Sequence, residues 1–149
     1  MLDREAITRL MVDYADRIDA NDPDGSAACF AEDGVGEYWG SYVGRPAIAA
    51  RLRGILKAFD ATSHHLSNVR IWLDGDTARA QSYVYAFHRI RSSGAPMHYW
   101  GRWVDRLVKI EGQWLFAHRE VVGIGSMNGG DPPSDLRHPG HPGRIAHAN

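Results

Sequence analysis

The stretch ATSHHLSNVRIWLDGDTARAQSYVYAFHRI, residues 61–90, decides the fold because the chain changes within it from helical to extended periodicity. Two runs with strand-like alternation flank the turn signal DGD, which predicts an antiparallel hairpin. Two further runs, MHYWGRWVDRLVKI and QWLFAHREVVGI, follow the turn signals SSGAP and EGQ. Together these segments predict an antiparallel meander of four strands.

The part of the chain before residue 61 predicts helices. Apolar residues recur at three- and four-residue spacing over about residues 3–21, which is typical of a helix with one buried stripe. A short second helix is predicted over 25–31 and a third over 45–59. Pro46 stands where proline is favoured, in the first turn of that third helix.

Helices therefore come first and the sheet follows, which favours an α+β fold over alternating α/β units. The segment GVGEYWGSYVG, residues 34–44, alternates glycines with aromatics, as in a strand that bends closely around a neighbour. We expect a conical α+β barrel in which three N-terminal helices wrap a curved antiparallel sheet. One domain is predicted over 1–126, followed by an irregular extension over 127–149 that is rich in Pro, Gly and His.

Composition excludes several classes of protein. The chain has 149 residues, 44% of them hydrophobic, and a formal net charge of −1. These values argue against disorder and against nucleic acid as a partner. The N-terminus MLDREAITRL resembles no signal peptide, and no run is long enough to span a membrane. Cys29 is the single cysteine, which is compatible with the cytoplasmic location that we expect.

An acid and a pair of histidines are the first candidates for chemistry. Asp19 lies near the end of the first predicted helix, at the edge of its apolar stripe, where it either points inward or merely caps the helix. A carboxylate is disfavoured at a helix C-terminus, so a compensating partner is expected. His64 and His65 are adjacent, and strand alternation sends only one of them to the interior. An interior imidazole held by Asp19 would suit a general base, whereas the alternative is a partly exposed histidine bonded to a backbone carbonyl.

Two further polar residues have two interpretations each. His88 lies within a predicted strand, where it either shuttles protons or is a satisfied histidine at a strand edge. Arg119 either stabilises an anionic intermediate or leaving group, or forms a surface ion pair with Asp105 or Glu120. Histidines are numerous, but the strands contain no short ligand spacing such as H-x-H or H-E-x-x-H. We therefore predict no metal site.

The predicted strands are rich in tyrosine and tryptophan. Most of these rings belong to the core or to a subunit interface, and a few are expected to line an apolar cavity for a ring-shaped ligand. Trp72, Trp100 and Trp114 are expected on the open face of the sheet, where they would expose a large apolar area. This expectation predicts a homo-oligomer, either a dimer or a trimer.

Four motifs in order carry a resemblance to a known family: AITRLMVDYADRIDANDPDG, FAEDGVGEYWG, HHLSN and IEGQWLFAHRE. Over about residues 3–125 the chain resembles the SnoaL-like branch of the nuclear-transport-factor-2-like superfamily. Within that branch it is most similar to scytalone dehydratases and the hexachlorocyclohexane dehydrochlorinase. The resemblance implies a cofactor-free lyase with a conical α+β barrel.

The resemblance also implies roles for individual residues. The family's catalytic acid falls on Asp19 and its base on His65, which is followed by a short polar stretch ending in Asn. Tyr38 matches a tyrosine of the first strand in scytalone dehydratases, and His88 matches their second histidine. Arg119 falls near a pocket arginine of the dehydrochlorinase type.

Departures from the family pattern bear on the substrate. Ile18 replaces the tyrosine that precedes the catalytic acid in scytalone dehydratases, and Gly101 and Trp103 replace a Ser-x-Asn pair. Trp103 is expected to contact a substrate other than scytalone, a small aromatic or alicyclic compound. The resemblance implies a dehydratase-like lyase. Isomerase, cyclase or retro-aldol chemistry with the same dyad remains open, as do a water-activating hydrolase and a non-catalytic binding or oligomerisation module.

Overall fold

The structure is a computed structural model that describes residues 2–128. Its helices are α1 (Asp3–Asp19), α2 (Pro23–Ala28) and α3 (Arg45–Leu56). Its strands are β1 (Phe30–Glu37), β2 (Ser41–Val43), β3 (Phe59–Asp74), β4 (Thr77–Ile90), β5 (Pro96–Ile110) and β6 (Gln113–Asn128). The predicted α+β class is confirmed. None of these helices is long and apolar enough to cross a membrane.

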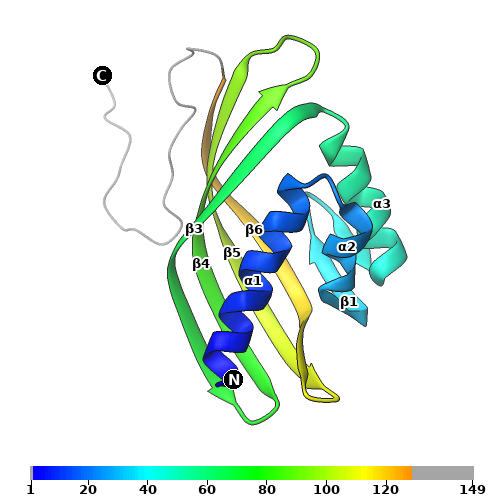
Figure 1. Cartoon of the computed structure of the whole chain (residues 1–149), viewed down its shortest axis with the longest axis vertical. Coiled ribbons are helices and arrows are strands. Elements are labelled where there is room, and N and C mark those ends of the chain that lie inside the picture. Colours follow the sequence, from blue (N-terminus) through cyan, green and yellow to red (C-terminus); the bar gives the residue numbers. More distant parts are fainter. Residues whose placement is uncertain (1, 129–149) are drawn as a thin grey trace.

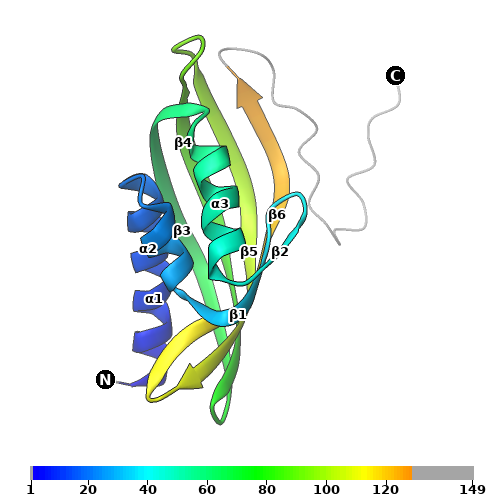
Figure 2. The same ribbon diagram turned by 90° about the vertical axis from the view of Figure 1, so that its right-hand side faces the viewer.

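The six strands form one curved sheet in the order β2-β1-β6-β5-β4-β3. The meander from β3 to β6 is antiparallel throughout, as predicted. Strand β1 instead runs parallel to β6; a helix and four strands intervene between the two in sequence, and a parallel pair needs such a long crossover. The sheet is not closed, and all three helices lie against one of its faces (Figure 1 and Figure 2).

Helix α2 is shorter than predicted and begins earlier. Asp22 caps it by accepting a hydrogen bond from the backbone N–H of Gly25 at 2.8 Å, and Pro23 occupies its first turn. Phe30, predicted to lie on this helix, begins β1 and pairs with Phe116 of β6. The two rings pack 5.4 Å apart in the core.

Two other boundaries differ from the sequence prediction. Phe59, expected on the third helix, begins β3. Strand β6 continues to Asn128, two residues beyond the expected domain end, because Met127 and Asn128 still pair with His98 and Met97 of β5. The irregular extension predicted over 127–149 otherwise lies outside the described residues.

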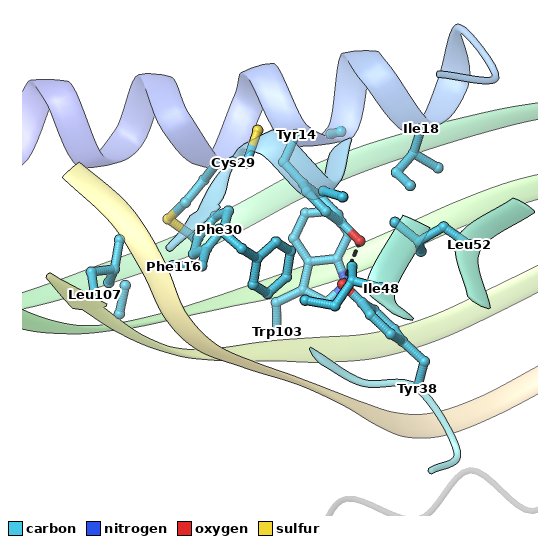
Figure 3. Packing of buried hydrophobic residues seen from close by; sticks show 14 of the residues in the cluster. Tyr14, Ile18, Cys29, Phe30, Tyr38, Ile48, Leu52, Trp103, Leu107 and Phe116 are labelled. Carbon is cyan, nitrogen blue, oxygen red and sulfur yellow. Dashed lines mark hydrogen bonds between the residues drawn. The ribbon is translucent and has the colours of Figure 1, made fainter. Parts of the chain in front are cut away.

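The core lies between α1 and the concave face of the sheet (Figure 3). Of the six residues in its predicted apolar stripe, helix α1 buries Ile7, Met11, Tyr14, Ala15 and Ile18, and the sixth, Leu10, is partly buried against the same core. Strand β4 faces this stripe with mostly small side chains, Ala78, Ala80, Ser82, Val84 and Ala86, all of them buried. The first helix and the middle strands are therefore fixed against each other by apolar burial, which positions the end of α1.

We predict that Met11→Ala lowers the free energy of unfolding by about 2–5 kcal/mol, because it leaves a cavity beneath α1. Met11 is 1% exposed, whereas its neighbour Val12 is 43% exposed. Val12→Ala on the same helix is the control, with an expected change within about 0.5 kcal/mol. Urea denaturation measures both, and equal losses for the two variants would contradict this packing.

Candidate active site

The carboxylate of Asp19 accepts three hydrogen bonds from strand β3. Oδ1 lies 2.6 Å from Nδ1 of His64 and 2.8 Å from Oγ1 of Thr62. Oδ2 accepts from the backbone N–H of His64 at 2.8 Å. Asp19 is the last residue of α1, so these contacts tie the end of the helix to the strand and hold the imidazole in one orientation.

These donors also set the ionisation of the pair. Partial burial acts to raise the pKa of Asp19, but hydrogen bonds from the side chain and backbone of His64 and from Thr62 outweigh it and lower that pKa. Asp19 is therefore a carboxylate at neutral pH and can only accept hydrogen bonds. Nδ1 of His64 is then the donor in this hydrogen bond, and Nε2 is the ring nitrogen that the carboxylate does not hold.

The prediction that His65 is the partner of Asp19 is wrong. Thr62 and His64 lie two residues apart and share the inner face of β3, so Ser63 and His65 point to the other face. There the exposed His65 ring lies 3.0 Å from Oγ of Ser63 and packs beside Tyr85. Asp19 does bond to one of the two adjacent histidines, but that histidine is His64.

A cavity of about 190 Å³ opens beside the dyad between the helices and the inner face of the sheet. Its polar lining residues are Tyr14, Tyr38, His64, His88 and Tyr99. The remainder of the lining is apolar and comes from every layer of the fold: Ile18, Trp39, Leu52, Ile55, Leu56, Phe59, Val84, Met97, Trp103 and Val121. A small, mostly apolar ligand with one or two oxygen atoms fits this lining.

His88 lies across the cavity from α1, on β4. Its ring centre is 5.4 Å from that of His64 and 4.5 Å from that of Phe59. Burial, and then the neighbouring His64, lower the pKa of His88 to about 4. Its Nδ1 is buried and has no hydrogen-bond partner among residues 2–128. At neutral pH His88 is therefore a neutral ring that faces the dyad.

Tyr38 follows β1 directly and lines the cavity. In Figure 3 its hydroxyl points toward Tyr14. Its hydroxyl lies 2.7 Å from the hydroxyl of Tyr14, which comes from α1. Burial is the main reason that the pKa of both phenols is raised, that of Tyr14 to about 12. Both hydroxyls thus keep their protons and act as donors at neutral pH.

Trp103 lines the cavity as expected, but Arg119 does not. The guanidinium of Arg119 donates from Nε and Nη2 to the two carboxylate oxygens of Asp105, each at 2.8 Å. Both side chains are completely buried, so this pair belongs to the interior and is not the surface pair considered from sequence. Direct contact between Arg119 and a ligand is not supported, because the rings of Tyr14 and Trp103 lie over the guanidinium.

Sequence reasoning missed Tyr14 and His64 as site residues. Tyr14 was placed only on the apolar stripe of α1, yet it lies one turn before Ile18, and both side chains line the cavity. His64 could have been found from Leu66, which packs against the core and shares its strand face. Within residues 2–128, no group of three or more His, Cys, Asp or Glu side chains is arranged to hold a metal ion.

The comparison with known proteins identifies the family. The sequence profile of the SnoaL-like domain matches residues 1–120. The chain belongs to the SnoaL-like domain family. The resemblance predicted from the four motifs is thus confirmed, whereas no curated protein matches the chain.

Solved structures similar to this SnoaL-like domain share its whole fold. One, from Novosphingobium aromaticivorans DSM 12444, is assigned as a scytalone dehydratase; it is 33% identical with a TM-score of 0.78, over 89% of this chain and 91% of that one. Another from the same organism, assigned as an aromatic ring hydroxylase, is 26% identical with a TM-score of 0.77, over 89% and 92%. A hexachlorocyclohexane dehydrochlorinase is 17% identical with a TM-score of 0.79, over 93% and 95%, and shows the fold alone.

We predict that His88 makes the stability of the domain fall in mild acid. Its folded-state pKa of about 4 lies below the ordinary value of 6.5, so between these values the unfolded chain binds a proton that the folded protein does not. The stabilisation is complete above about pH 6.5 and is lost as the pH falls toward about 4, by roughly 3 kcal/mol at most.

Urea denaturation at about pH 7 and at about pH 4.5 checks this. His88→Gln should flatten the loss of stability between the two, whereas His65→Gln makes the same change on the open face and should retain it. An equally steep loss in His88→Gln would contradict the assignment.

Proposed function

We propose that this protein is a cofactor-free, dehydratase-like lyase in which His64 removes a proton from a carbon atom of a small aromatic or alicyclic compound. The observation that carries the proposal is the 2.6 Å contact between Nδ1 of His64 and Asp19 at the wall of an apolar cavity. The carboxylate holds the tautomer that a base needs and stabilises the imidazolium that forms. Such a dyad is worth about 10²–10⁴-fold in rate.

The remaining polar groups of the cavity suit the second half of an elimination. The electron pair of the broken C–H bond forms the new double bond, and the C–O bond to a hydroxyl group breaks. The leaving oxygen takes a proton and departs as water. Tyr38 is the donor that we favour, since its hydroxyl is protonated at neutral pH and lies in the cavity wall. His88 is neutral there and can serve only as a neutral donor.

The relatives support this reaction class. The structure assigned as a scytalone dehydratase is 33% identical over most of both chains, and elimination of water is the reaction that its name implies. A non-catalytic binding module is the rival class, and it needs no acid bonded to a histidine beside a cavity. The geometry of Asp19 and His64 favours the enzyme over this module.

We predict that His64→Gln lowers turnover by at least about a hundredfold, because the glutamine amide has no basic nitrogen that could take the substrate proton. The measurement is turnover of a panel of hydroxylated aromatic compounds and cyclic ketones in the presence of a chelator. The adjacent His65→Gln is the matched control, with an expected rate close to that of the unmodified protein. Unchanged turnover in His64→Gln, or the same loss of turnover in His65→Gln, would contradict the proposal that His64 is the base.

We further propose that the uncovered face of the sheet joins copies of the chain into a homo-oligomer. Trp72 is 46% exposed on this face, and Trp100 stacks there with His98 and Tyr85. Trp114 was expected beside them, but it lies in the core, where its indole N–H donates to Asp3 at 2.9 Å. The apolar face is therefore smaller than the sequence predicted, but it is not covered by any of the described helices.

Sedimentation at low protein concentration checks the interface. Trp72→Glu is expected to shift the protein toward monomer, because it would bury an unpaired charge in the contact. Val12→Glu changes an exposed apolar residue on α1, on the side of the sheet that carries the helices, and serves as the control. A wild-type protein that sediments as a monomer would contradict the proposal.

A further inference from the structure

Stability alone does not explain why Arg119 and Asp105 are buried as an ion pair, because well-packed apolar residues of similar volume can stabilise a fold equally well. Asp105 binds the Nε and Nη2 edge of the guanidinium. Nη1 is also buried and has no hydrogen-bond partner among the described residues. One edge of the cation is therefore neutralised by a carboxylate and the other is not.

Aromatic rings surround this cation. The central carbon of the Arg119 guanidinium lies 4.3 Å from the ring centre of Tyr14, 4.2 Å from that of Trp103 and 3.8 Å from that of Phe116. These distances are typical of strong cation–π contacts, and a guanidinium is suited to them by its planar, weakly hydrated charge. The cage fixes a positive charge directly behind the Tyr14 ring, whose other parts line the cavity.

The hydroxyl of Tyr14 connects the ring beside this charge to Tyr38. It shares a 2.7 Å hydrogen bond with the hydroxyl of Tyr38, and both residues line the cavity (Figure 3). Two hydroxyl groups that share one hydrogen bond leave one proton unused. A cation against the face of the first phenol makes its O–H a stronger donor, and a chain of hydrogen bonds strengthens along its length.

We propose that Arg119 is a positioning residue that acts through Tyr14: it polarises the Tyr14–Tyr38 hydroxyl pair, which donates a hydrogen bond to a substrate oxygen that gains negative charge. The inference rests on the proposed function, since it concerns the same cavity, and it restricts the class of compounds that can be substrates. That substrate oxygen belongs to the leaving hydroxyl group, which gains negative charge as the C–O bond breaks, and it must reach the hydroxyl pair while the acidic C–H bond faces His64. A substrate with a halogen alone would leave the pair without an acceptor.

The test uses para-nitrophenol, a single-ring probe whose absorption spectrum distinguishes the phenol from the phenolate. It is carried out in the His64→Gln background, where the dyad cannot take the proton of the probe. We expect the cavity to bind the phenolate about tenfold to a hundredfold more tightly than the phenol, as hydrogen bonds to an anion do. Tyr38→Phe and Tyr14→Phe should each abolish most of that preference.

The role of Arg119 is tested by the double variant Asp105→Leu/Arg119→Met, which removes both charges so that neither is left buried alone. The preference for phenolate should fall about tenfold or more while the neutral phenol still binds. Arg102→Met is the matched control, because Arg102 also lies over a tyrosine ring, that of Tyr83 at 5.7 Å, and it is expected to leave the preference unchanged.

Three results would overturn the inference. The first is that the His64→Gln protein does not bind the phenolate in preference to the phenol, or does not bind the probe. The second is that the preference for phenolate survives in the double variant Asp105→Leu/Arg119→Met. The third is that this preference survives in Tyr14→Phe. The last variant keeps a ring against the cation and removes only the hydroxyl, so it decides the relay even if the double variant does not fold. None of these results depends on turnover, so they leave the test of His64 independent.

Discussion

The three hydrogen bonds to the Asp19 carboxylate are the interaction on which the site depends. Asp19 ends α1, and its partners Thr62 and His64 belong to β3, so the bonds join two elements that are far apart in sequence. Apolar burial along α1 brings the carboxylate to the sheet, and the carboxylate then fixes the tautomer and the ring of His64. The orientation of the His64 ring follows from the packing of the first helix.

Much of the fold follows from periodicity in the sequence. The apolar stripe of α1 and the alternation along β4 predict which side chains are buried, because each period matches one kind of backbone. The parallel contact between β1 and β6 could not be predicted, since it is a long-range pairing without a local signal. The predicted C-terminal ends of α2 and α3 lie too far along the chain for a related reason. Phe30 and Phe59 fit the apolar stripe of a helix as well as the alternation of a strand.

A contact between Asp19 and one of the two adjacent histidines is predicted from the sequence, but the structure places His64 there and not His65. Alternation indicates that one of His64 and His65 is inside but does not say which. Leu66 supplies the missing signal, because an apolar residue on a half-buried strand marks the inner face and shares it with His64. The hydroxyl pair and the caged guanidinium gave no local pattern, since Tyr14, Tyr38 and Arg119 come from three elements that meet only in the folded chain.

Strand β3 lies at the edge of the sheet, with β4 as its one neighbouring strand. Edge strands carry outward amide groups that invite another chain to add a strand. The bond from the His64 N–H to Asp19 occupies one of these amides, so the carboxylate that orients the His64 ring also protects the edge. Loss of that carboxylate would expose a template for strand addition and release the His64 ring, so the geometry of the candidate site and colloidal stability are coupled through one side chain.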